Sequence, residues 1–116
     1  MDKRHQARLE IVQQIFAHDF APQNAGSLTL SEKSKTIIDS IEMIDKLIRE
    51  AAPKFPIEKI AKVDLSVLRL AVYEIIIEKK VPPKVSINEA IELAKDMGGE
   101  KSPAFVNAVL GKIYNK

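Results

Sequence analysis

Apolar residues recur along the chain at the three-to-four-residue spacing that is typical of amphipathic helices, and no stretch shows the alternation of a strand. The first stretch predicts a helix over residues 4–20. The segment at 21–27, which holds Pro22, Gly26 and Ser27, breaks the spacing and predicts a loop. The apolar stripe of this first helix consists of Ile11, Val12, Ile15, Phe16 and Phe20.

The next stretch predicts one long helix from Thr29 to Ala52. Thr29 and Glu32 have the spacing of a capping box, in which each side chain satisfies a free backbone N–H at the start of a helix. Pro53 and Pro56 end the pattern. The stripe of this helix is Ile37, Ile41, Ile44, Ile48 and Ala51.

A third helix is expected from Asp64, its N-cap, to about Lys80, after a short turn that contains Ile57 and Ile60. Its apolar residues cover most of the circumference, so we expect this helix to be the buried, central one. They are Leu65, Leu68, Leu70, Ala71, Val72, Ile75, Ile76 and Ile77.

Two further helices complete the chain after Pro82-Pro83. Ser86 and Glu89 form a second capping box for a helix that ends at Gly98-Gly99, where we expect a left-handed stop. Ser102 is expected to cap the last helix, with Pro103 at its first position. The sequence therefore predicts an all-α, compact helical bundle in which residues 1–116 form a single domain.

Composition excludes several classes of function. The 116 residues suffice for one domain, and the net charge is only +2. With no cysteine and two histidines, the chain lacks the residues for a disulfide framework or a multi-histidine metal site. We find no catalytic residues, metal site or cofactor motif. The polar N-terminus and the lack of a long apolar run predict a cytoplasmic protein with no membrane partner.

The start of the first helix carries an unusual group of cations. Arg4 and Arg8 project on the same side as Ile11 and Ile15. Because an uncompensated arginine is not buried, we expect this end to overhang the body and to expose a cationic patch. The patch consists of Lys3, Arg4, His5 and Arg8. It either binds an anionic ligand or is an ordinary solvated first turn.

Arg69 and Glu74 interrupt the otherwise apolar central helix. Being five positions apart, they point to different sides and need separate partners. Two interpretations are open at this point. Each residue forms a pair with a neighbouring helix or with water, or Glu74 belongs to a protein interface.

Three segments together closely resemble the NusB family of transcription antitermination factors. They are Leu-Arg-Leu-Ala-Val-Tyr-Glu at 68–74, Ile-Asn-Glu-Ala at 87–90 and Phe-Val-Asn at 105–107. The resemblance implies two small helical subdomains that share one core. These correspond to residues 1–53, which hold the basic-ended first helix and the long second helix, and 54–116.

The resemblance also implies a function, which is binding and not catalysis. The family binds boxA-type single-stranded RNA of ribosomal RNA leaders together with NusE, a ribosomal small-subunit protein, which connects it to the transcription elongation complex. A homodimer is expected when the partner is absent. By matched position, the implied RNA-binding residues are Lys3, Arg4, His5, Arg8, Lys101 and Phe105, and the implied partner-binding residues are Phe16 and Glu74.

The chain departs from the family pattern at several positions. Its basic start has fewer arginines, Phe16 replaces a common tyrosine, Ala108 replaces a common glycine, and the stretch before Phe55 is short. Two alternatives therefore accompany the RNA-binding hypothesis. One is a protein-interaction module of the same fold that has lost RNA recognition. The other is an accessory domain that acts in trans on ribosomal RNA processing or modification.

Overall fold

The computed structural model describes residues 2–20 and 30–115, and within these ranges it contains helices and no strand. The α-helices are α1 (Lys3–Phe20), α2 (Glu32–Asp39), α3 (Ile41–Ala51), α4 (Lys62–Val72), α5 (Pro83–Met97) and α6 (Ser102–Tyr114). A 3₁₀ turn, Ile57–Lys59, precedes α4, and a π-helical segment, Tyr73–Glu78, continues it. The all-α prediction is confirmed.

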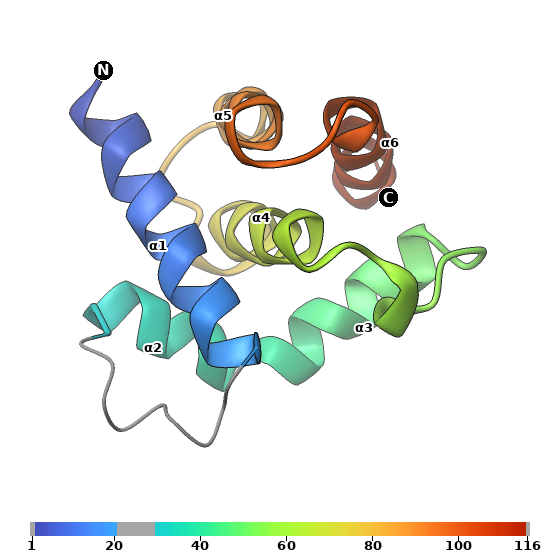
Figure 1. The fold of residues 1–116 in the computed structure, drawn as a ribbon, viewed down its shortest axis with the longest axis horizontal. Coiled ribbons are helices and arrows are strands. Elements are labelled where there is room, and N and C mark those ends of the chain that lie inside the picture. The colour runs from blue at the N-terminus through green and yellow to red at the C-terminus, as the bar shows by residue number, and fades with distance from the viewer. Residues whose placement is uncertain (1, 21–29, 116) are drawn as a thin grey trace.

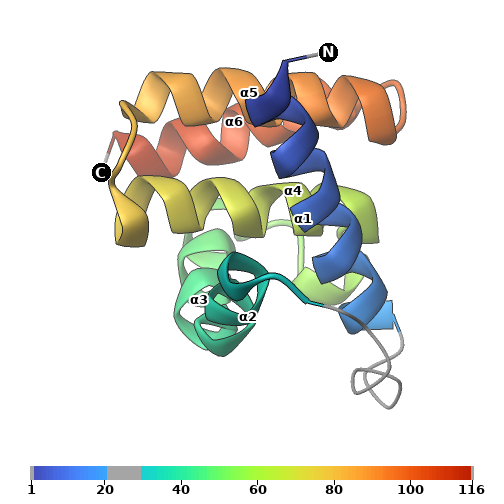
Figure 2. The ribbon, with the colours of Figure 1, turned by 90° about the vertical axis from the view of Figure 1, so that its left-hand side faces the viewer.

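Helix α4 lies at the centre of the molecule. Figures 1 and 2 show α5 and α6 side by side on one side of α4 and the α2–α3 pair on the other, while α1 crosses the layers along one flank. Every residue from Asp64 to Val72 is buried, because this helix is covered from all directions. The central position predicted from its apolar circumference is therefore confirmed.

A single apolar cluster joins the helices. It is built almost entirely from Ile, Val, Leu and Ala, with Tyr73 as its one buried aromatic residue among those described. The largest of its completely enclosed side chains are Ile15, Ile37, Ile44, Ile48, Leu68, Leu70, Leu93 and Leu110.

The single helix predicted from Thr29 to Ala52 is in fact two helices that meet at Ser40. The Ser40 hydroxyl donates a hydrogen bond to the Thr36 carbonyl at 3.0 Å, and its N–H bonds to the Ile37 carbonyl. Such local bonds compete with helix continuation. The N-cap is Ser31, whose hydroxyl accepts from the Ser34 N–H at 3.1 Å. Thr29 and the predicted loop at 21–27 lie outside the described residues.

The central helix also differs from its prediction at both ends. It begins at Lys62 after Ala61, so Asp64 lies in the first turn and is not the cap. After Val72 the backbone widens into the π-helical segment, and the Lys79 N–H bonds to the Glu74 carbonyl, five residues back, at 2.9 Å. Lys79 ends the segment in the left-handed conformation, with φ of 55°.

The second predicted capping box and the left-handed glycine stop are both wrong. Helix α5 begins at Pro83, so Ser86 is a buried residue of its first turn. Gly98 ends the helix with φ of −99°, in an extended conformation. Glycine is required there for space, because a Cβ would lie 2.5 Å from the Ser102 Oγ. That hydroxyl accepts from the Gly99 N–H at 3.0 Å, and Ser102 is the first residue of α6 instead of its cap.

Among the residues that the structure describes, no helix is both long and apolar enough to cross a membrane.

Candidate nucleic-acid interface

Arg8 does not belong to an exposed patch. Its side chain lies inward from α1 with 8% of the residue exposed. Its Nε donates to Glu74 Oε2 and its Nη2 to Glu74 Oε1, both at 2.9 Å. The expectation of an overhanging, exposed Arg8 is wrong, because a carboxylate from another helix compensates the buried charge.

Glu74 occupies the other end of this pair, in the π-helical segment after α4. Only 2% of the residue is exposed. Its Oε1 also accepts a hydrogen bond from the Ser86 hydroxyl of α5 at 3.0 Å. The hydrogen bonds to Glu74 raise the pKa of Arg8, although burial opposes them. Three segments, α1, the π-helical segment and α5, therefore meet at one charged, buried centre.

Arg69 is paired with a carboxylate in the same way on another side of α4, although its Nη1 is buried without a hydrogen bond among the described residues. Its Nε and Nη2 donate to the two carboxylate oxygens of Asp45 in α3, at 2.9 and 2.8 Å. Its Nη1 lies 3.4 Å from Asp19 Oδ1 in α1. The prediction that Arg69 and Glu74 need separate partners from neighbouring helices is confirmed.

His5 attaches the first turn of α1 to α5. Its Nδ1 lies 3.1 Å from Glu89 Oε2 and its Nε2 lies 2.8 Å from Asp96 Oδ2. Two carboxylate partners favour the imidazolium form, in which both ring nitrogens donate. The hydrogen bond to Glu89, followed by that to Asp96, raises the pKa of His5 above its ordinary value of 6.5. Figure 2 shows the beginning of α1 crossing α5.

Two cations of the predicted patch are exposed. Lys3 and Arg4 lie on the surface, and neither side chain forms an ion pair within the described residues. The Asp2 carboxylate accepts a hydrogen bond from the Arg4 N–H at 3.2 Å and so caps the helix. The first turn carries no acidic residue, so Lys3 and Arg4 oppose the helix dipole. This unfavourable placement is compatible with an anionic ligand at this end.

Lys101 and Phe105 lie where α6 begins. Lys101 is exposed, and Phe105 is half-buried. The ring of Phe105 meets the ring of Phe55 edge to face, with centroids 5.3 Å apart and an interplanar angle of 74°. Sequence reasoning did not single out Phe55, which is 51% exposed. The feature of the sequence that could have identified Phe55 is an aromatic residue between Lys54 and Pro56 in a chain with only 5% aromatic residues.

Phe16 is half-buried and not fully part of the core stripe. It stacks on Phe20, with ring centroids 6.1 Å apart and an interplanar angle of 12°. Phe20 is 72% exposed, so the pair forms an aromatic surface on α1. Glu74, the other implied partner-binding residue, is enclosed by Arg8 and Ser86 and does not share that surface.

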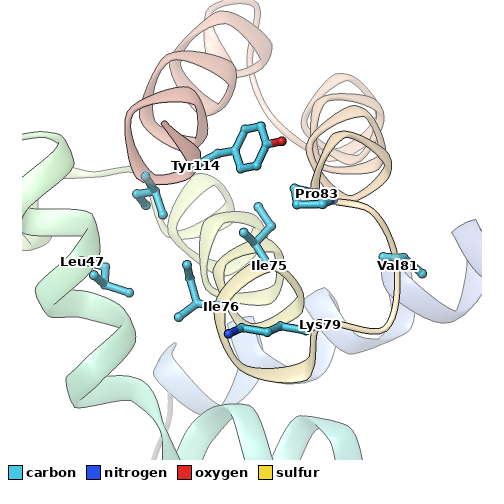
Figure 3. A pocket seen from close by; sticks show the side chains of 8 residues that line it. Leu47, Ile75, Ile76, Lys79, Val81, Pro83 and Tyr114 are labelled. Atoms are coloured by element: carbon cyan, nitrogen blue, oxygen red, sulfur yellow. The ribbon is translucent and has the colours of Figure 1, made fainter. Parts of the chain in front are cut away.

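A groove of about 520 Å³ opens between α3, the π-helical segment and the end of α6. Figure 3 shows Leu47 on one side and Tyr114 and Pro83 on the other, with Ile75 and Ile76 between them. Lys79 is the single charged residue of its lining, so the groove offers no acid–base pair. No group of three or more histidine or acidic residues within residues 2–20 and 30–115 is placed to hold a metal ion.

Comparison with known proteins gives consistent matches. The sequence model of the NusB family matches residues 5–115. A transcription antitermination protein NusB of Agathobacter rectalis is 51% identical over 83 residues, which are 72% of this chain and 63% of that protein. The chain therefore spans less than two thirds of this relative. The NusB of Dehalococcoides mccartyi is 36% identical over 126 aligned residues, covering 95% of this chain and 88% of that protein.

Solved structures agree over the whole chain. A crystal form of T. maritima NusB has a TM-score of 0.83 and 34% identity, covering 100% of this chain and 93% of that one. A crystal structure of the antitermination factors NusB and NusE in complex with dsRNA has a TM-score of 0.78 and 26% identity, covering 98% of both chains.

Proposed function

This chain belongs to the NusB family, and from that premise we propose that it is an RNA-binding transcription antitermination factor and not an enzyme. It binds boxA-type RNA of ribosomal RNA leaders together with NusE, which connects the complex to the elongating polymerase. The observation that carries this proposal is the match over 98% of the chain to a NusB solved with NusE and RNA. The protein acts in the cytoplasm as a single domain, residues 1–116, with subdomains 1–53 and 54–116.

The geometry divides the implied RNA-binding residues into two groups. Lys3, Arg4 and Lys101 are exposed cations that contact phosphates, and Phe105 offers a ring on which a base stacks. His5 and Arg8 act differently, because their charged groups are engaged by carboxylates of the same chain. They are positioning residues that hold the first turn of α1 in place.

The two partner-binding residues also act by different routes. Phe16, together with Phe20, presents an aromatic surface that contacts NusE. Glu74 acts indirectly: its bonds to Arg8 and Ser86 fix α1, and with it Phe16, against α4 and α5. In the absence of NusE, the same aromatic surface supports a homodimer.

The test is binding of a fluorescent, single-stranded boxA-type RNA by anisotropy, with and without NusE. A scrambled RNA and a boxA duplex serve as competing ligands, the duplex because the solved relative holds dsRNA. We expect boxA-selective binding that tightens with NusE and weakens in Arg4→Glu. Lys84→Glu, an exposed cation at the start of α5, is the matched control. Equal binding of all three RNAs contradicts the proposal.

A second candidate follows from the internal use of His5 and Arg8. Because two of the four residues expected in the cationic patch are paired within the chain, the surface charge left for RNA is small. A protein-interaction module that binds NusE and has lost RNA recognition is consistent with this observation. Intact NusE binding together with weak, unselective RNA binding favours this second candidate.

A further inference from the structure

The Phe55–Phe105 pair has a hollow on each side, and both rings line both hollows. The larger hollow, about 710 Å³, extends to the turn between α5 and α6. The smaller, about 180 Å³, lies against the segment after α3 and the outer face of α6. Figure 1 shows that the connection from α3 to α4 runs on the same side of the molecule as α6. The aromatic pair therefore forms a wall between two neighbouring depressions.

Unpaired cations surround this wall. Lys59 and Lys101 line the larger hollow, and Lys54 and Lys112 line the smaller one. All four are exposed, and none forms an ion pair within the described residues. Lys62, in the first turn of α4, by contrast pairs with Asp19 at 2.9 Å. Exposed aromatic rings among free cations are typical of single-stranded nucleic-acid binding, where bases stack and cations contact phosphates.

Asp64 gives the larger hollow a polar wall. The residue is only 8% exposed, and its Oδ1 has no hydrogen-bond partner within the described part of the chain. A buried acceptor without a partner is unfavourable, and a ligand N–H can satisfy it. Asp64 and Glu100, the two acids of this lining, repel a phosphate. The deep part of this hollow thus suits a base, and the phosphates stay beside the lysines at its rim.

We propose that the Phe55–Phe105 pair holds two consecutive nucleotides of single-stranded RNA, one base in each hollow. This inference rests on the proposed function and extends its RNA surface from Lys101 and Phe105 to Lys54, Phe55 and Lys59. The base in the larger hollow donates to Asp64 through an amino group. Adenine, cytosine or guanine is therefore preferred there over uracil, which carries no amino group and donates only through its ring N3–H.

The first experiment removes the aromatic wall. Phe55→Ala is compared with Met43→Ala, in which a different exposed apolar side chain, one on α3, is truncated. Circular dichroism melting checks the fold of both variants. The probe is fluorescein-labelled boxA-type RNA with two added nucleotides at each end, bound in the presence of NusE. Phe55→Ala weakens binding by roughly 5- to 150-fold, which corresponds to the loss of stacking on one base, and Met43→Ala leaves it unchanged.

A shortened series of the same RNA locates the contact. As nucleotides are removed one at a time from each end, the effect of Phe55→Ala disappears once the RNA no longer reaches the hollows. An effect of equal size on every RNA, down to the shortest that binds, overturns the inference, because it indicates a change elsewhere in the protein.

The second experiment counts phosphates. Lys54→Ala with Lys59→Ala lowers the slope of log K against log salt by about 1.4, since each lost contact to a single strand contributes about 0.7. Lys80→Ala with Lys84→Ala is the matched control. Lys84 lies in the first turn of α5 and Lys80 just before it, at the end of α5 that is away from Lys101, and these exposed lysines have no ion pair among the described residues. The control leaves the slope unchanged, and an equal effect of the two pairs overturns the inference.

The third experiment tests the choice of base. Asp64→Asn replaces an acceptor by an amide that also donates, so it shifts preference toward uracil at one position of the RNA. Unchanged preference at every position contradicts the assigned role of Asp64.

The experiments distinguish a failure of this inference from a failure of the proposed function. If Arg4→Glu weakens RNA binding but Phe55→Ala and the lysine pair do not, the function holds and this inference is wrong. If the unmodified chain binds no boxA-type RNA even with NusE, the function itself is wrong. A polyglutamate peptide serves as a probe for acidic protein ligands. If Phe55→Ala loses binding of this peptide but keeps its affinity for RNA, the inference is overturned and the surface binds a protein.

Discussion

Arg8 and Glu74, 66 positions apart in the chain, form a two-pronged ion pair in the interior, with both N–O distances at 2.9 Å. The pair joins the RNA-binding helix proposed here to the segment that the family pattern assigns to partner binding. Because neither residue reaches the surface, both roles depend on one buried contact.

Truncation of Arg8 is expected to destabilise the fold strongly. Arg8→Ala leaves Glu74 charged, buried and without its main partner, which costs about 3–5 kcal/mol of unfolding free energy. Urea unfolding measures the loss. Arg4→Ala, one turn earlier and exposed, is the control and stays within about 0.5 kcal/mol. In the double variant Arg8→Met/Glu74→Leu much of the loss is recovered; a sum of the two single losses contradicts the pairing.

His5 makes stability depend on pH. Its pKa is raised in the folded protein, through hydrogen bonds to Glu89 and then to Asp96, above the ordinary value of 6.5. The folded state therefore binds the proton more tightly than the unfolded state. The stabilisation is complete below the unfolded pKa and is lost as the pH rises through the folded one. We expect the unfolding free energy of the wild type to fall across this window relative to His5→Gln.

NMR titration of the His5 ring gives an independent check of that prediction. A pKa of His5 at or below the ordinary value of 6.5 contradicts the two-carboxylate contact.

Gly98 and Gly99 are expected to respond very differently to the same change. A Cβ on Gly98 would lie 2.5 Å from Ser102 Oγ and 2.9 Å from the Ala94 carbonyl oxygen, whereas nothing lies within 4 Å of one on Gly99. Gly98→Ala therefore costs about 1–3 kcal/mol, the usual cost of overpacking, and Gly99→Ala changes little. Thermal unfolding measures the melting temperatures of the two variants. Equal melting temperatures argue against the tight turn between α5 and α6.

Arg4 and Arg8 should separate binding from stability. Arg4→Ala lowers the salt slope of RNA binding by about 0.7, the contribution of one phosphate contact, without changing the melting temperature. Arg8→Ala lowers the melting temperature and weakens RNA and NusE binding together, because α1 is no longer fixed. A reduced salt slope in Arg8→Ala at a temperature where it is fully folded shows that Arg8 contacts RNA directly.

The helices and the central place of α4 could be predicted because apolar spacing reports which face is buried. The break at Ser40 could not, since apolar residues continue on both sides and a hydroxyl bond to the backbone decides the geometry. The sequence predicts a left-handed stop at Gly98, but glycine is required there because of the Ser102 side chain of the next helix.

For the candidate site, the types of residue could be predicted better than their exposure. The spacing of α1 placed Arg8 on the apolar face, but the compensating carboxylate comes from 66 residues away and has no local signal. His5 is the same case, with partners 84 and 91 residues away. The Phe55–Phe105 pair joins a loop to a helix, so helical periodicity has no bearing on it.

The contacts of His5 and Arg8 also set an order of events during synthesis. Ribosomes add about 5–20 residues per second and release the N-terminus first, so α1 emerges seconds before its partners. Arg8 has no carboxylate to meet until Glu74 has left the exit tunnel, and His5 has none until Glu89 and Asp96 follow. Helix α1 therefore forms these contacts only after α5 has emerged, and its cationic first turn is held in place as a binding surface only from that point.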